Sequence, residues 1–216
     1  MAAKNEFLRT SNAIDWDNSS VLTQARALAH HGDAARTASA CFKFVRDRIK
    51  HSRDFEMNPS TWKASDVLLH GTGYCYAKSH LLAALLRANG LPAGLCYQRL
   101  SVNDAGPPYC LHGFNAVDLP DIGWYRMDAR GNKPGVDARF TPPREQLAFA
   151  LLSEDEVEFE NIFAEPLEVV TTVLRSSPGW RQTLATLPDV EPAAFDRLGL
   201  TIRRRGPLTP SSSNPL

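Results

Sequence analysis

The stretch CYAKSHLLAALLRAN, residues 75–89, constrains the fold more than any other part of this chain. It is rich in Ala and Leu, which are the strongest helix formers, and the Gly and Pro that follow predict its end. Leu81 and Leu85 lie on one apolar stripe, and Leu82 and Leu86 widen that stripe beyond what a surface helix buries. We therefore expect a helix that is buried on most of its circumference, with the rest of the chain packed around it.

The segments before and after this helix differ in their predicted secondary structure. Residues 17–70 are typical of helices, one beginning near Ser19 or Ser20 and one capped by Asp33. After the central helix, the short runs AGLCYQRL, YCLHGFNAVDL and GWYRMDA are separated by turn-forming residues, as in strands of a meander. Helices followed by such strands predict an α+β domain with an antiparallel sheet.

The last third of the chain gives a weaker pattern. PREQLAFALL and PLEVVTTVLRSS indicate helices that pack on the outside, so we expect a helical extension over residues 134–202. The run RRRGPLTPSSSNPL, residues 203–216, has the composition of a disordered tail. The expected organisation is one domain over residues 1–202, with a helical part at 17–70 and a core at 71–133.

Composition and charge argue against several kinds of partner. Lys and Arg together number 24, as do Asp and Glu, so no bulk charge indicates nucleic acid or an acidic membrane. The start of the chain has no apolar signal-peptide region, and no apolar run is long enough to cross a bilayer, which predicts a cytoplasmic protein without membrane contact. The four cysteines lie far apart without a CxxC pair, which disfavours a disulfide framework and a structural zinc site.

Cys75 stands where a thiol gains nucleophilic character. The first N–H groups of a helix and its aligned peptide dipoles favour a nearby negative charge, and the attacking form of cysteine is the thiolate. Gly71 and Gly73 just before it allow a sharp turn and leave space for a substrate. Most free cysteines are simply small buried hydrophobes, so Cys75 needs a base beside it to be a nucleophile.

His112 is the candidate base, and Asp128 is its candidate partner. His112 lies in an alternating run typical of a strand, and Asp128 ends the next strand. If the two strands form a hairpin that turns at Pro120, the two residues are equally far from the turn and face each other. Asp118 or Asp121 are alternatives to Asp128, although Asp121 falls in the turn itself. The carboxylate would fix the imidazole tautomer and leave the other ring nitrogen for the thiol.

Other polar residues have simpler interpretations. His30, His31 and His51 fall in early helical segments and are expected to be solvated or capping, while His70 and His80 have no aspartate placed to orient them. Cys110 shares a strand face with His112. A metal site from Cys75, Cys110 and His112 is an alternative, but packing beside the site is the preferred interpretation of Cys110. Cys41 and Cys96 occupy apolar positions of the core.

Taken together, the segments resemble a known family. Gly-x-Gly-x-Cys leading into AKSHLLAALLRANGLPA, a histidine on a strand, and then GWYRMDA are similar to the core of the transglutaminase-like superfamily, in particular its bacterial cysteine protease branch. FVRDRIKHSRDFE and ASDVLLHGTGYC resemble the stretch before the nucleophile in that branch. The resemblance covers roughly residues 38–133.

The resemblance implies a papain-like fold with Cys75 as nucleophile, His112 as general base and acid, and Asp128 as the residue that orients it. It implies acyl transfer through a thioester, on a peptide, an isopeptide or a glutamine amide, released to water or to an amine; a protease-like hydrolase is the preferred choice. No calcium loop motif is present, so no metal and no cofactor is expected. Papain-like enzymes take a second oxyanion donor from a side chain upstream of the cysteine, for which Asn58 and Trp62 are the guesses.

Two alternatives differ in class. The first is a catalytically idle binding or scaffold module that keeps the fold, and the second is a metalloenzyme. The partner expected of the enzyme is a protein or peptide substrate, and the sequence gives no oligomeric state.

Overall fold

The structure, a computed structural model, describes residues 2–204. Its α-helices are α1 (Ser19–Ala27), α2 (Ala34–Arg48), α3 (Ala64–His70), α4 (Cys75–Ala88), α5 (Glu168–Ser176) and α6 (Trp180–Ala185). Short 3-10 helices are η1 (Ala2–Leu8), η2 (Pro192–Ala194) and η3 (Asp196–Leu198). The strands are β1 (Lys50–His51), β2 (Thr72–Gly73), β3 (Ala93–Ser101), β4 (Tyr109–Leu119), β5 (Gly123–Met127), β6 (Arg139–Thr141), β7 (Arg144–Gln146), β8 (Val157–Phe159) and β9 (Ile202–Arg204).

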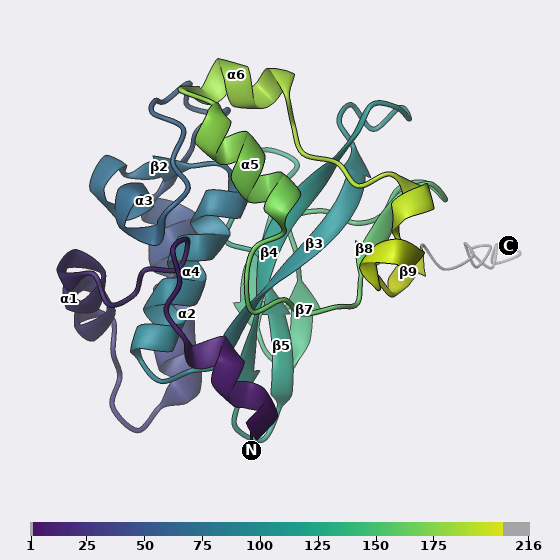
Figure 1. Cartoon of the computed structure of the whole chain (residues 1–216). Helices are drawn as coiled ribbons and strands as arrows, with labels where there is room; N and C mark the ends of the chain where they lie inside the picture. Colours follow the sequence, from purple (N-terminus) through teal and green to yellow (C-terminus); the bar gives the residue numbers. More distant parts are fainter. Residues whose placement is uncertain (1, 205–216) are drawn as a thin grey trace, which may run out of the picture.

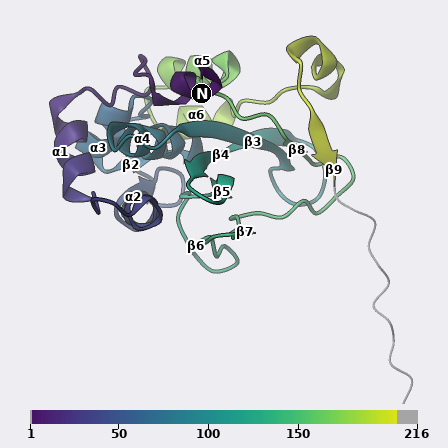
Figure 2. The same ribbon diagram turned by 90° about the horizontal axis from the view of Figure 1, so that it is seen from below.

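The main sheet is antiparallel, with strand order β5-β4-β3-β8-β9. Helices α1 to α4 gather beside it (Figure 1). Seen from below, α5 and α6 lie on one side of the sheet and the small hairpin β6–β7 lies on the other (Figure 2). This arrangement confirms the α+β class, with a helix that begins at Cys75 packed on an antiparallel sheet.

Helix α4 is the centre of the molecule. Every residue from Cys75 to Arg87 is buried, and the helix contacts α1, α2, α3, β3 and β4. The wide apolar surface expected from the sequence is therefore covered on all sides. Gly90 has φ +75, the left-handed conformation that the end of this helix requires.

The polar end of α4 is also buried, and its arginine is bonded through all three guanidinium nitrogens. The Arg87 guanidinium donates to the carbonyls of Ala93, Arg9 and Ala164, at 3.0, 2.7 and 2.6 Å. These three carbonyls belong to segments far apart in the chain. Arg87 thereby joins the N-terminal segment, β3 and the chain after β8 to the central helix.

The early helices form close to where the sequence places them. The Asp33 side chain caps α2 by accepting from the Arg36 N–H at 2.8 Å, as expected. Helix α1 begins at Ser19, but Asn18 is the residue that caps it. In both cases a short polar side chain satisfies a backbone N–H that has no partner inside the helix.

The hairpin of β4 and β5 differs in register from the expected one. The turn centres on Asp121 rather than Pro120, and Asn115 pairs with Met127. Each partner is therefore displaced by two residues, and His112 is not directly opposite Asp128. Because side chains alternate between the faces of a strand, a displacement of two residues keeps both on the same face.

The expected helical extension over residues 134–202 is wrong for its first half. PREQLAFALL contains β7 and then irregular chain, and β8 follows at Val157–Phe159. In this segment the Ala148 N–H donates to the Asp128 carboxylate at 3.1 Å, and not to a carbonyl one helical turn earlier. PLEVVTTVLRSS does contain helix α5.

The expected tail begins inside the sheet. Arg203 and Arg204 belong to β9, which pairs with β8, so for them the prediction of disorder is wrong. Residues 205–216 lie outside the described part of the chain. Within residues 2–204, no helix combines the length and the apolar character needed to traverse a bilayer.

Candidate active site

Cys75 is the first residue of α4, and short strands hold the turn that leads to it. Strand β1 pairs in parallel with β2, with His51 opposite Gly73. The Ser52 N–H donates to the Gly73 carbonyl at 3.1 Å. Gly71 ends α3 in the left-handed conformation with φ +64, which lets the chain turn into β2. These contacts fix Cys75 at the helix N-terminus, where the first N–H groups have no acceptor inside the helix.

Gly73 does not leave room for a substrate, contrary to the expectation from the sequence. A Cβ added there would lie 3.1 Å from both the Ala77 Cβ and the Thr61 Oγ1. The space is thus filled by the protein itself. The glycine lets β2 pack closely against the first turn of α4.

Gly113 performs a similar task on the sheet side. A Cβ added at Gly113 would lie 3.1 Å from the Tyr76 Cδ1 and 3.2 Å from the Tyr76 Cα, which is backbone. Gly113 follows His112 on β4, and Tyr76 follows Cys75 on α4. The missing side chain therefore allows the strand that carries the histidine to approach the helix that carries the cysteine.

His112 and Asp128 are in direct contact. The His112 Nε2 lies 2.7 Å from the Asp128 Oδ2, and both side chains are buried. Asp128 also accepts the Arg130 N–H at 3.0 Å and the Ala148 N–H at 3.1 Å. The Phe149 ring packs edge-on against the imidazole, with centroids 4.8 Å apart. These contacts hold the imidazole with Nδ1 as its remaining polar atom.

Electrostatics make the pair an imidazolium and a carboxylate. Burial alone would lower the pKa of His112, but its charge interactions and hydrogen bonds with Asp128 and Cys75 raise that pKa to about 10. Burial raises the pKa of Asp128, yet the His112 charge and the hydrogen bonds from His112, Arg130 and Ala148 outweigh it, so the net direction is downward. At neutral pH both groups are therefore charged.

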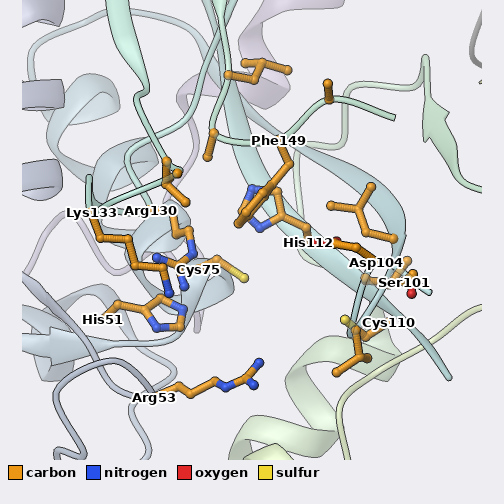
Figure 3. A pocket seen from close by; sticks show the side chains of 18 of the residues that line it. His51, Arg53, Cys75, Ser101, Asp104, Cys110, His112, Arg130, Lys133 and Phe149 are labelled. Atoms are coloured by element: carbon orange, nitrogen blue, oxygen red, sulfur yellow. The ribbon is translucent and has the colours of Figure 1, made fainter. Parts of the chain in front are cut away.

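The Cys75 sulfur projects into the cavity beside the His112 ring, with which it interacts by a hydrogen bond, and both lie on the wall of one pocket (Figure 3). This pocket has a volume of about 800 Å³, within the usual range for ligand sites. Cys75 itself is 7% exposed. The structure thus brings together the three residues that the sequence singled out, from α4, β4 and the end of β5.

Several residues at this site were not expected from the sequence. The Ala148 amide and the Phe149 ring come from the segment that was expected to be a helix. His51 was expected to be solvated or capping, but it is buried, lines the pocket and packs edge-on against Tyr74 with centroids 5.3 Å apart. Its position depends on the pairing of β1 with β2, a contact between two-residue strands that leaves no pattern in the sequence.

The alternatives for the acidic partner lie elsewhere. Asp118 pairs with Lys4 at 2.7 Å, and Asp121 lies in the turn with φ +63. Both guesses for the upstream oxyanion donor also fail. The Asn58 Oδ1 accepts the Trp180 N–H at 3.0 Å, and neither Asn58 nor Trp62 lines the pocket.

Of the remaining cysteines and histidines, some are buried in the core and one lines the pocket. Cys41 and Cys96 are buried in the core, as expected, whereas Cys110 is partly exposed and lines the pocket beside Cys75. His80 is buried with Nδ1 at 2.7 Å from the Trp62 carbonyl oxygen. Among the described residues, no group of three or more His, Cys, Asp or Glu side chains is arranged to hold a metal ion.

Comparison with models of known protein families shows which family the chain belongs to. The model described as the transglutaminase-like superfamily matches residues 22–129, half of the chain. The protein belongs to the transglutaminase-like superfamily. The match extends from α1 to the residue after Asp128, so it contains Cys75, His112 and Asp128. The resemblance inferred from the sequence is confirmed at this level, and the transglutaminase-like fold places the chain in a family of cysteine-dependent enzymes.

Individual relatives of this transglutaminase-like protein share smaller parts of it. A curated relative, the CMP-5'-(3-aminopropyl)phosphonate synthase of Streptomyces rubellomurinus, is 34% identical over 71 residues, which are 33% of this chain and 11% of the relative. The chain thus spans about a ninth of that protein.

Solved structures with a similar arrangement include a proposed cysteine protease from Cytophaga hutchinsonii, with 18% identity, a TM-score of 0.48, and coverage of 60% of this chain and 43% of that one. The periplasmic domain of TgpA from Pseudomonas aeruginosa has 20% identity, a TM-score of 0.45, and coverage of 59% and 46%. An arylamine N-acetyltransferase from Mycobacterium abscessus has 17% identity, a TM-score of 0.39, and coverage of 70% and 55%. The chain therefore spans roughly half of each of these structures.

Proposed function

We propose that this protein is a cysteine-dependent hydrolase of amide bonds in peptides, isopeptides or glutamine side chains, with Cys75 as nucleophile, His112 as acid and base, and Asp128 as the residue that orients His112. One observation carries the proposal. The Cys75 sulfur lies within hydrogen-bonding reach of a histidine that a buried carboxylate holds at 2.7 Å.

The first half of the reaction transfers the acyl group to sulfur. The Cys75 thiolate attacks the carbonyl carbon, and the electron pair of the C=O bond moves to oxygen. When the tetrahedral intermediate collapses, the C–N bond breaks, and His112 gives its Nδ1 proton to the departing amine. The raised pKa of His112 supports this assignment, because the imidazolium that donates the proton is then the form present before attack.

The second half returns the enzyme to its starting state. His112, now neutral, takes a proton from a water molecule as that water attacks the thioester carbon. The C–S bond breaks, the acid is released, and Cys75 leaves as thiolate beside the re-formed imidazolium. An amine in place of water would give transamidation by the same steps, and the open pocket is compatible with either acceptor.

We assign the oxyanion to two donors. The Cys75 backbone N–H is one of the unpaired donors at the start of α4. His51 is the second. Burial and the Arg130 charge lower the pKa of His51 well below its usual value, so its ring is neutral and has one N–H.

The role of His51 requires one tautomer. Its Nδ1 is buried without a hydrogen-bond partner, 3.8 Å from the Asp54 Oδ2. As an oxyanion donor, the neutral ring would carry its proton on Nε2 and leave Nδ1 unprotonated.

Alkylation tests the nucleophile without knowledge of the substrate. Iodoacetamide should label Cys75 at pH 6 at least tenfold faster than it labels the same peptide in the chain unfolded by urea, because His112 and the N-terminus of α4 face the sulfur only in the folded site. His112→Ala should remove most of this advantage. Cys110→Ser is the matched control, since it removes a pocket thiol and should leave the labelling of Cys75 intact.

Two results would count against the proposal. Labelling of folded Cys75 at the unfolded rate would remove the nucleophile. If Cys75→Ala left a peptide-cleavage or deamidation activity of the purified protein unchanged, the chain would be better described as a binding or scaffold module. We also propose a cytoplasmic location, because all four cysteines are free thiols and a reducing compartment would keep the nucleophile active.

A further inference from the structure

The pocket beside Cys75 contains cations that differ in how they are neutralised. Arg130 binds the Asp54 carboxylate through two nitrogens, at 2.6 and 3.1 Å, and Lys133 binds the same carboxylate at 2.8 Å. Arg53 also lines the pocket and is exposed. Within residues 2–204, the Arg53 side chain has neither an ion pair nor a hydrogen bond. Its guanidinium is therefore a cation available to a ligand.

The backbone of Arg53 is fixed beside the nucleophile. The preceding residue, Ser52, donates its N–H to Gly73 at 3.1 Å, and its hydroxyl lies 3.0 Å from the Thr72 hydroxyl. Gly73 stands two residues before Cys75. The side chain of Arg53 thus starts from an anchored point of the backbone.

The guanidinium points into the pocket, below the Cys75 sulfur in Figure 3. Its charge acts on both walls of the site. Burial raises the pKa of Tyr74, and Arg53 partly offsets this rise. Burial also raises the pKa of Cys110 to about 12, and Arg53 acts against that rise as well. Tyr74 precedes Cys75, and Cys110 lies on the strand that carries the base.

The acidic residues of the pocket do not neutralise Arg53. Glu156 accepts the Ser101 N–H at 2.9 Å, and Asp137 pairs with Arg139 at 2.7 Å. Asp104, on the loop between β3 and β4, lies beyond His112 on the other side of the pocket from Arg53 (Figure 3). The guanidinium of Arg53 therefore lies on the side of the pocket near the sulfur, and the Asp104 carboxylate lies on the other side (Figure 3).

We propose that Arg53 is a specificity-determining residue that binds a carboxylate of the substrate, so that the enzyme selects amides with a carboxylate close to the bond that is cleaved. Such substrates include acidic peptides and amides next to a free terminal carboxylate. This inference rests on the proposed function of Cys75. A guanidinium presents paired N–H donors that match the two oxygens of a carboxylate, and this match gives direction as well as charge.

Two alkylating reagents test the inference on the intact protein. Iodoacetate and iodoacetamide attack the same thiolate with the same leaving group, but only iodoacetate has a carboxylate. The measurement is the ratio of the two rates at Cys75, followed by mass spectrometry of its peptide. His112 acts on both reagents in every variant, so a change in the ratio between variants reports on Arg53.

Arg53→Gln should lower the iodoacetate-to-iodoacetamide ratio by about three- to tenfold, which corresponds to about 0.7–1.4 kcal/mol. Any effect of the lost charge on the thiolate is shared by both reagents and cancels in the ratio, and the difference in ratio should shrink at high salt. Arg53→Lys should keep most of the ratio, because it keeps the charge. Arg36→Gln, at an exposed arginine on α2, is the matched control and should leave the ratio unchanged.

The outcomes separate the two proposals. A ratio that stays the same in Arg53→Gln, with rapid labelling by iodoacetamide, overturns the role of Arg53 and leaves Cys75 as the nucleophile. A ratio that falls equally in Arg36→Gln shows a general effect of net charge and also overturns it. If neither reagent labels folded wild-type Cys75 faster than the unfolded chain, the proposed function fails, and the substrate inference fails with it.

Discussion

Asp128→Asn is the substitution with the sharpest consequence, because every group that faces this carboxylate is a donor. The Arg130 N–H faces one oxygen, and the Ala148 N–H and the His112 Nε2 face the other. An asparagine has one oxygen and one NH₂ group. In either orientation of the amide, at least one buried N–H therefore faces another donor.

The magnitude follows from two contributions. A hydrogen bond to a charged group stabilises by about 1.5–3 kcal/mol, and a buried donor without a partner costs about 1–3 kcal/mol, so we expect a loss of about 3 kcal/mol or more in the free energy of unfolding. The pKa of His112, raised from 6.5 to about 10, corresponds to about 5 kcal/mol of preference for the imidazolium. Without the Asp128 charge, the pKa of His112 should fall from this raised value, because burial then opposes only the contribution of Cys75.

The loss should depend on pH in a defined direction. Because the pKa of His112 is raised in the folded state, its contribution is complete below the unfolded value of 6.5 and is lost as the pH rises toward 10. Because the pKa of Asp128 is lowered, its contribution is present above the unfolded value of 3.8 and is lost on further acidification. The difference between wild type and variant should therefore be largest between about pH 4 and 6.5 and should shrink at higher pH.

Guanidinium chloride unfolding of both proteins at pH 6 and pH 9 measures this difference. Subtraction is needed because Lys78, whose pKa burial lowers to about 7, has the opposite pH dependence in the same range. The Asp128 charge raises the pKa of Lys78, so the part that subtraction does not remove also shrinks as the pH rises. A difference below about 1 kcal/mol at pH 6, or one that does not shrink by pH 9, would refute the account of the His112–Asp128 pair. Iodoacetamide labelling of Cys75 in the variant should also slow, since the amide favours the tautomer in which His112 Nε2 accepts a hydrogen bond.

Two further substitutions test the packing around the site. Gly113→Ala should destabilise by about 1–3 kcal/mol and slow the labelling of Cys75 at least tenfold, because the new Cβ would lie 3.2 Å from the Tyr76 Cα; unchanged stability and labelling would contradict the close-approach argument. Lys78→Met removes an amine whose pKa burial lowers to about 7, so the cost of burying its charge is complete below pH 7 and is relieved as the pH rises toward 10.5. The stability of the Met variant relative to wild type should thus fall by up to about 4 kcal/mol between pH 6 and 10.5, and a pH-independent difference in urea unfolding would contradict this.

The sequence predicts the elements of this fold better than their mutual placement. Helix α4 and strands β3 to β5 are each encoded by a local pattern, and the glycine that ends α4 has the expected left-handed conformation. The contact of His112 with Asp128 was predicted for a partly wrong reason. The expected register was displaced by two residues, and the prediction survived because faces alternate with a period of two.

What the sequence did not predict depends on contacts between distant segments. His51 reaches the pocket through pairing of two-residue strands, and Arg53 follows it. The segment with Ala148 and Phe149 has apolar residues that fit a helix, but it instead gives an amide to Asp128 and a ring to His112. Such roles are set by the neighbouring strand and not by the local periodicity, so a window of sequence does not contain them.

Cys75 and His112 belong to different elements, helix α4 and strand β4, which pack against each other at the site. Gly113 and Tyr76 form the close contact between the strand and the helix. A shift of α4 relative to β4 by less than a bond length would change the distance between the Cys75 sulfur and the His112 ring, while both elements stayed folded. The alkylation rate of Cys75 therefore reports how closely α4 packs against the sheet. It should respond to core substitutions far from the pocket before the protein loses any folded structure.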